Sequence, residues 1–328
     1  MSEKKTGITS RGWQAESAGT VGTNRTGGVA LCYLLPPPMS ETGKLGAGSA
    51  IAAYVALLIG MLAIGAPAQQ HGIVAGLWIT EALAIALPAI FALSVAGARF
   101  GPFLGIRKLS LKHALIAVVV SAANQPIVSF LTWAARELLP SNIVADFDAK
   151  QRMLDTVFAA HAWPMTITVV IAAPLGEELF FRGFALPALR RSWGIVAAVL
   201  VSGALFSLLH MDPVGFLGLM EIGVMLAALR WWSGSLWAAV LGHAVNNGIA
   251  GAAFMLGYED PDLPPPVWVL LLGAALLLAG LVALVRVLRA PSPAAPLEES
   301  RGPRWPAAIA LAVLWIASVA IGVSSLRR

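Results

Sequence analysis

The architecture is indicated most clearly by one stretch, PMTITVVIAAPLGEELFFRGFALPAL, which comprises residues 164–189. It is apolar over enough length to cross a lipid bilayer as a helix, for which about 20 residues are needed. The stretch nevertheless contains Glu177, Glu178 and Arg182, although an ionised side chain at the bilayer centre costs at least about 2.5–3.5 kcal/mol. We therefore expect a membrane helix in which these three residues have a function.

The composition also indicates an integral membrane protein. Hydrophobic residues make up 58% of the chain and charged residues 12%, and the mean hydropathy is +0.79, which no soluble core requires. Apolar windows long enough for a span lie at 46–66, 73–96, 114–136, 157–185, 194–210, 213–230, 235–257, 266–288 and 306–326. They predict an all-α fold, a polytopic transmembrane helical bundle of eight to nine spans. The short fifth and sixth windows predict a tight hairpin or a partly re-entrant pair.

The chain divides into three predicted regions. Residues 1–44 are polar and rich in Gly, Ser and Thr, and we expect a disordered segment whose first 38 residues are a possible start-site extension. Residues 45–290 form the predicted membrane core. Residues 291–328 form a linker and a possible final transmembrane helix, since the Pro-rich and Ala-rich composition ends at the last apolar window.

Basic residues predict the orientation, because short cytoplasmic loops are enriched in Lys and Arg. One side carries Arg99, Arg107, Lys108, Lys112, Arg190, Arg191, Arg230, Arg286 and Arg289, and we predict that it is cytoplasmic. The other side carries the acidic loop 259–262, whereas the terminal Arg327 and Arg328 violate the pattern. An Ala-rich composition with Arg preferred over Lys favours the cytoplasmic membrane of a bacterium. The net charge of +5 is small and spread over loops, so we expect no nucleic-acid partner.

The two adjacent glutamates have different expected roles. On a helix of 3.6 residues per turn, Glu178 and Arg182 lie about 40° apart and can pair, whereas Glu177 and Arg182 lie about 140° apart. Glu177 is left without a local partner, and a buried carboxylate of that kind is a candidate general base for water. The alternative is a structural Glu–Arg pair that holds two helices together, although such a pair needs only one carboxylate.

Three further polar residues lie in apolar windows. His210 follows Phe206 by one helical turn, so that Phe206 can pack against its imidazole ring. His243 and Asn247 are four residues apart and share a helix face, with Asn246 within reach. Two donors directed at one point can stabilise an oxyanion, but such residues also form ordinary helix–helix hydrogen bonds in membranes.

Together, these motifs resemble those of a known protein family. The sequence EELFFR at 177–182, then FSLLH at 206–210, then HAVNN at 243–247 resembles the CPBP family of intramembrane proteases, which includes the type 2 CAAX prenyl protease and bacteriocin-processing or immunity relatives. GSLW at 234–237 is also similar to the family pattern. The motifs cover roughly residues 170–250, and the rest of the chain agrees only in being helical and membrane-embedded.

The resemblance implies a role for each matching residue. Glu177 would activate water, with Glu178 as a supporting acidic residue and Arg182 as a supporting basic residue. His210 would assist the water or orient Glu177. His243 and Asn247 would bind the oxyanion or the substrate carbonyl. The resemblance favours a glutamate-type mechanism without a metal cofactor. From the residues alone, Glu177, His210 and His243 could instead be the three protein ligands of a zinc ion, although no His-Glu-x-x-His motif is present.

The sequence thus predicts an intramembrane endopeptidase that cleaves a peptide or protein substrate in or near the lipid bilayer. We expect its site in a water-accessible cavity among the fourth, fifth and seventh spans. The alternatives are a catalytically idle immunity or scaffold protein and a proton-coupled transporter. The clustering of charged residues in one half of the chain argues against transport. The substrate, the cleavage site and the oligomeric state cannot be read from the sequence.

Overall fold

The computed structural model describes residues 45–256, 263–286 and 302–325. The expectations for residues 1–44, for the acidic loop 259–262 and for most of the linker therefore lie outside the described residues. The described residues form helices and connecting turns without a β-strand, which confirms the predicted all-α class.

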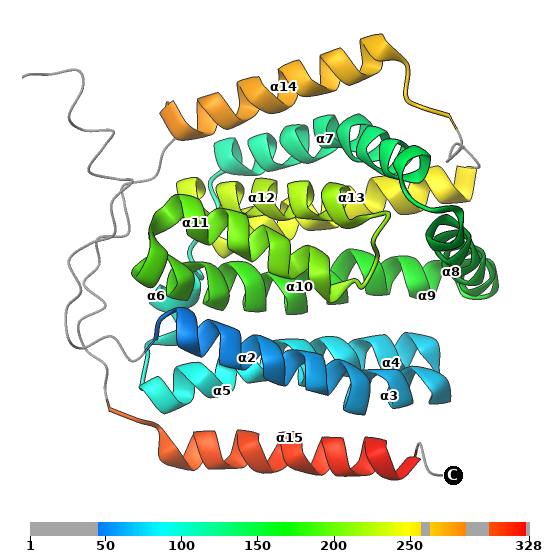
Figure 1. Ribbon diagram of the computed structural model, residues 1–328. Coiled ribbons are helices and arrows are strands. Elements are labelled where there is room, and N and C mark those ends of the chain that lie inside the picture. Colours follow the sequence, from blue (N-terminus) through cyan, green and yellow to red (C-terminus); the bar gives the residue numbers. More distant parts are fainter. Residues whose placement is uncertain (1–44, 257–262, 287–301, 326–328) are drawn as a thin grey trace, which may run out of the picture.

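The helices run roughly side by side through the bundle (Figure 1). Their bounds are α2 (Ala47–Gly60), α3 (Ala66–His71), α4 (Ile73–Ile79), α5 (Leu87–Ala96), α6 (Phe100–Leu104), α7 (Leu111–Leu138), α8 (Ser141–Ala160), α9 (Ala162–Ile167), α10 (Ala173–Glu178), α11 (Leu186–Leu209), α12 (Phe216–Ser233), α13 (Leu236–Leu256), α14 (Val267–Arg286) and α15 (Trp305–Ser325). Short π-helical segments join several of them, at Met61–Gly65, Thr80–Ala86, Thr168–Ala172 and Leu179–Ala185.

Eight continuous helical stretches of the described chain are long and apolar enough to cross a membrane. The fourth, Ala162–Leu209, contains two of the nine predicted windows. Gly194 breaks it with φ 79° and ψ 173°, a left-handed φ that glycine adopts at little cost. The rings of Phe181 and Phe206 lie 5.5 Å apart on either side of this break. The chain therefore doubles back within the stretch, as Figure 1 shows for α10 and α11.

The predicted tight hairpin between the fifth and sixth windows is confirmed. α11 and α12 are joined by a short turn in which the Asp212 carboxylate accepts hydrogen bonds from the backbone N–H groups of Val214, at 3.1 Å, and Gly215, at 3.0 Å. The two helices pack closely, because a Cβ atom on Gly223 would lie only 2.6 Å from the Cα atom of Gly203. Small residues permit this approach of backbones in membrane bundles.

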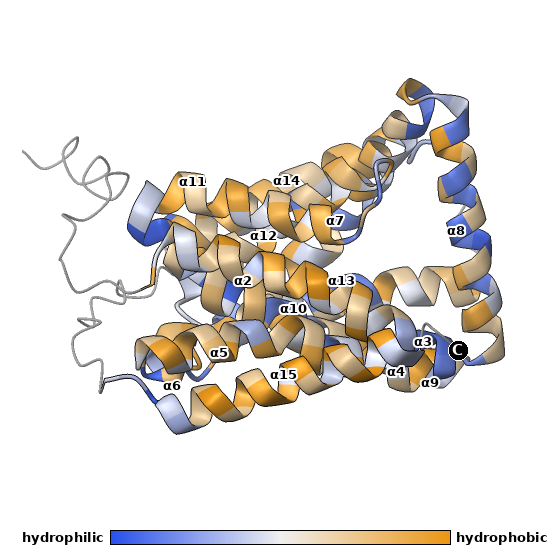
Figure 2. Cartoon of the chain, turned by 60° about the horizontal axis from the view of Figure 1, so that its bottom comes forward, coloured by the Kyte–Doolittle hydropathy of each residue, from blue (hydrophilic) through white to orange (hydrophobic). Residues whose placement is uncertain are grey.

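One helix was not predicted, and it changes the start of the fourth span. α8 mixes polar and apolar residues along its length and lies across one end of the bundle (Figure 2). Of its residues only Phe147 is buried, against Ala135 and Val214. The apolar residues 157–160 belong to α8, and His161, with φ −135° and ψ 38°, separates it from α9. The window 157–185 was therefore wrong at its beginning, since the span starts at Ala162.

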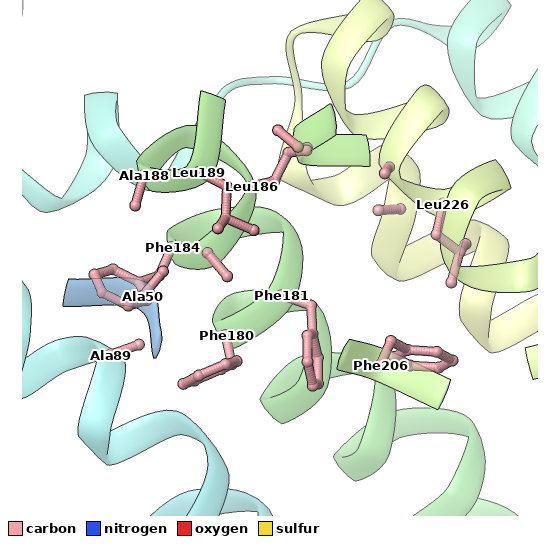
Figure 3. Packing of buried hydrophobic residues seen from close by; sticks show 14 of the residues in the cluster. Ala50, Ala89, Phe180, Phe181, Phe184, Leu186, Ala188, Leu189, Phe206 and Leu226 are labelled. Carbon is pink, nitrogen blue, oxygen red and sulfur yellow. The ribbon is translucent and has the colours of Figure 1, made fainter. Parts of the chain in front are cut away.

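The bundle core around the EELFFR motif is aromatic. Phe180, Phe181, Phe184 and Phe206 are at most 1% exposed, and they pack with one another and with small residues such as Ala50 and Ala89 (Figure 3). Aromatic rings are large and stiff, so this cluster fixes the helix that carries the glutamates relative to α2, α5 and α11. α14 and α15 lie at opposite edges of the bundle (Figure 1), and most of their residues face outward.

The predicted orientation can be tested on one helix. α7 has 28 residues and is therefore about 42 Å long at 1.5 Å per residue, with Lys108 before its start and Leu138 at its end. After replacement of Cys32, we expect Lys108→Cys to be labelled only from the cytoplasmic side and Leu138→Cys only from the other. Labelling of both positions from the same side of sealed cells would contradict the topology.

Candidate active site

The helix that carries the glutamates is widened on both sides of them. α10 ends at Glu178 and lies between the π-helical segments Thr168–Ala172 and Leu179–Ala185. Pro174, at the start of α10, has no N–H to donate, and a proline of this kind disturbs the regular α-helical hydrogen bonds before it. π-Helical turns inside α-helices are frequent at functional sites. The local sequence thus places Glu177 and Glu178 in an irregular part of a membrane helix.

Glu178 lies at the centre of a buried network. Its Oε1 accepts a hydrogen bond from Arg182 Nη1 at 2.7 Å, and both side chains are 0% exposed. The same oxygen lies 2.9 Å from Nδ1 of His243 on α13. Arg182 also donates through Nη2 to the carbonyl oxygen of Gly223 on α12, at 3.0 Å. The expected pairing of Glu178 with Arg182 is present, and it joins α10, α12 and α13.

These bonds define the tautomer of His243. Because a carboxylate only accepts, Nδ1 carries the proton in the contact with Glu178, and Nε2 of the neutral imidazole is then an acceptor. His243 can donate from Nε2 only when the ring is doubly protonated.

The ring of Phe206 contacts both His210 and His243. Its ring centroid lies 5.0 Å from that of His210 and 5.6 Å from that of His243, while the Arg182 guanidinium lies 4.4 Å over its face. Nδ1 of His210 lies 2.9 Å from the carbonyl oxygen of Phe206 and therefore carries a proton, which leaves its Nε2 as an acceptor. The predicted packing of Phe206 on His210 is present, and the same ring also contacts His243.

Glu177 is buried, with 7% of its surface exposed. Its Oε2 atom has no hydrogen-bond partner among the described residues, as expected for the glutamate that Arg182 does not reach. Asn247 forms no hydrogen bond with the Glu178 network within the described chain; its Nδ2 donates to the carbonyl oxygen of Val169, at 2.8 Å. One of the two N–H groups on that amide remains available. Asn246 instead accepts a hydrogen bond from Gln125 of α7, at 2.6 Å.

Sequence reasoning missed one carboxylate beside the site. Glu81, in the π-helical segment Thr80–Ala86, is 8% exposed, and its Oε2 has no partner within the described parts of the chain. A Cβ atom on Gly176 would lie 2.4 Å from that oxygen, so the absence of a side chain at Gly176 admits the carboxyl group next to Glu177. The two carboxyl groups interact electrostatically. Glu81 also weakens the argument against transport, because it lies in the first half of the chain.

Other polar residues lie at membrane depth outside this cluster. Glu221 on α12 accepts a hydrogen bond from Nδ2 of Asn124 on α7, at 2.6 Å. The rule that selected Glu177 for attention, a carboxylate inside an apolar window, would have found both Glu81 and Glu221 in the sequence. Nothing in the residue spacing alone, however, relates either of them to a particular neighbour.

The zinc alternative finds no suitable ligand set in the structure. Within the described residues, no three His, Cys, Asp or Glu side chains are placed together so as to hold a metal ion. Glu177, His210 and His243 are therefore not arranged as a three-ligand site, and we derive no step through a metal. Zinc remains the alternative to the metal-free mechanism, and elemental analysis can test it.

The fold and the site together define a polytopic helical membrane protein with a buried network of carboxylates, arginine and histidines. In a comparison with known protein families, residues 159–249 match the type II CAAX prenyl endopeptidase Rce1-like family. This segment includes all six residues that the sequence singled out, and the match supports membership in the CPBP, or CAAX protease, family. No curated protein and no solved structure matches it significantly.

Proposed function

We propose that the protein is an endopeptidase that hydrolyses a peptide bond of a membrane-associated peptide or protein, with water activated by Glu177. The observation that carries the proposal is the contrast between the two adjacent glutamates. Glu178 is held by Arg182 and His243 through Oε1, although its Oε2 has no partner within the described chain. Glu177 is buried, and the described residues make no hydrogen bond or ion pair with it. A structural role explains the first glutamate but not the second.

We propose the following steps for hydrolysis of the peptide bond. Glu177 takes a proton from water, with Nε2 of His210 as a second acceptor that orients the water, and the hydroxide oxygen attacks the carbonyl carbon. The developing oxyanion accepts hydrogen bonds from Nε2 of the His243 imidazolium and from the remaining N–H of Asn247, each donor being worth about 2.7–4 kcal/mol. The proton held by Glu177 then passes to the leaving amine as the C–N bond breaks, which regenerates the carboxylate.

The substrate can be sought by comparing the peptides of two kinds of cell. We expect cells that express the wild-type protein and cells that express Glu177→Ala to differ in their membrane peptides or small secreted peptides, with an uncleaved precursor accumulating in the variant. Quantitative peptide mass spectrometry measures this, and equal amounts of the two proteins must be verified in the membrane fraction. Identical peptide populations would favour the idle immunity or scaffold protein.

The mechanism predicts activity without a metal. After prolonged chelation the purified protein is expected to keep its turnover, because the proton acceptor and both oxyanion donors are side chains of the chain itself. Elemental analysis of the active preparation is the companion measurement. Stoichiometric zinc, with activity lost on its removal and restored on its return, would replace the glutamate-type mechanism while leaving the location of the site unchanged.

A further inference from the structure

Four arginines gather at the end of the bundle that carries the basic loops. Arg107 lies in the loop before α7, Arg190 and Arg191 lie in the first turns of α11, and Arg230 lies in the last turn of α12. Hydrogen bonds hold these segments together: Ser235 Oγ donates to the Arg107 carbonyl oxygen and Leu236 N–H to that of Gly105, both at 2.8 Å. Arg191 Nη1 donates to the carbonyl oxygen of Leu45, at 3.1 Å.

Arg230 is buried without a counter-charge among the described residues. Only 4% of it is exposed, and its Nε and Nη1 atoms have no hydrogen-bond partner in that part of the chain. Arg182 is equally buried, yet Glu178 and the Gly223 carbonyl satisfy it. A desolvated charge without such partners is strongly unfavourable. A ligand with acceptor oxygens would supply the partners that the Arg230 guanidinium lacks.

Gly105 provides the space for this guanidinium. Its φ is 72°, and a Cβ atom at this position would lie 2.0 Å from Arg230 Nη2. Within the described chain, Nε and Nη1 of Arg230 donate to none of the carbonyl groups that end α12. The helix dipole favours a cation in this last turn, but it supplies no hydrogen-bond partner for Nε and Nη1 of Arg230.

The neighbouring side chains increase the positive charge instead of neutralising it. Arg107 is exposed and is close enough to repel the Arg230 guanidinium. Arg190 lies 4.5 Å over the ring of Trp231, and Arg191 lies 5.3 Å over that of Phe103. The ion pairs of the described residues involve Arg136, Arg182 and His243, and none of these four arginines.

We propose that Arg230, together with Arg107, Arg190 and Arg191, binds the phosphate group of an anionic phospholipid. The planar guanidinium fork matches the oxygens of a phosphate, and clusters of basic residues at the ends of transmembrane helices attract anionic headgroups. Trp231 and Trp232 at the end of α12 are typical of the headgroup level of a bilayer. The site is separate from the candidate active site, since Gly223 lies seven residues earlier on α12, about 10 Å along its axis.

The test uses the purified full chain in neutral detergent, and its readout is the melting temperature. We expect phosphatidylglycerol to raise the melting temperature of the wild-type protein by several degrees, and phosphatidylcholine with the same acyl chains to do so much less. In Arg230→Gln the apparent affinity for phosphatidylglycerol should fall about tenfold or more, as the loss of charge-assisted hydrogen bonds implies. The matched control Arg152→Gln removes an exposed arginine of α8 and should retain the wild-type response.

A measurement with inorganic phosphate and a second arginine variant complete the test. Inorganic phosphate alone distinguishes the two sources of this ligand: an equal, Arg230-dependent shift would establish a free phosphate and overturn the lipid. If Arg230→Gln does not fold, Arg107→Gln takes its place, because Arg107 is exposed. Equal responses to the two lipids, or an undiminished response to phosphatidylglycerol in the arginine variants, would overturn the proposal.

Discussion

Replacing Glu177 by glutamine is expected to leave a folded protein whose turnover is lower by about 10²–10⁴-fold, the usual contribution of a general base. Glutamine has nearly the same shape but cannot accept the proton of the attacking water. The fold should be preserved, because Glu177 Oε2 has no partner among the described residues whose bond would be lost. The measurement is turnover of the precursor peptide, together with the melting temperature of the same preparation.

Glu221→Gln is the matched control for this prediction. Glu221 is also a carboxylate within a span, but it pairs with Asn124 and is assigned no role in the reaction. Its replacement should reduce turnover little. Full turnover in Glu177→Gln would show that another group is the base, and a similar loss in both variants would mean that any change of a membrane carboxylate impairs the protein.

The membrane spans could be predicted because their signal is carried by composition. Apolar runs of about 20 residues have few alternatives to a spanning helix. α8 was missed for the same reason: it buries only Phe147, and a helix at a surface has no long apolar run. The division of Ala162–Leu209 at Gly194 also could not be located by hydropathy, because a window average does not register the conformation of one glycine.

The site was predictable where partners are close in sequence. Glu178 and Arg182 pair because helical residues four apart are neighbours, and Phe206 contacts His210 for the same reason. The contact of Glu178 with His243 joins residues 65 positions apart, so it depends on how α10 and α13 pack. The bond from Asn247 to the Val169 carbonyl is also tertiary; it involves a backbone group that carries no information in the residue type.

The remaining large effect concerns stability. Replacing Glu178 by glutamine is expected to destabilise the protein by about 3–5 kcal/mol, the cost of removing one partner of a buried ion pair. Arg182 would then remain fully buried with the Gly223 carbonyl but without the carboxylate that is hydrogen-bonded to it. The measurement is the melting temperature in detergent, which should fall clearly below that of the wild-type protein.

Two further variants test whether the loss of stability in Glu178→Gln is caused by the uncompensated charge of Arg182. Glu81→Gln also neutralises a buried carboxyl group, but one whose Oε2 lacks a partner in the described chain and which interacts with Glu177, so its melting temperature should be unchanged or higher. Arg182→Met added to Glu178→Gln removes the uncompensated cation and should recover part of the lost stability, because the two residues form one coupled pair. If Glu178→Gln melts like the wild-type protein, or if Arg182→Met lowers its stability further, the buried pair does not hold these helices together. Turnover should be lower in Glu178→Gln even at temperatures where it is folded, since His243 would lose the carboxylate that orients its ring through Nδ1.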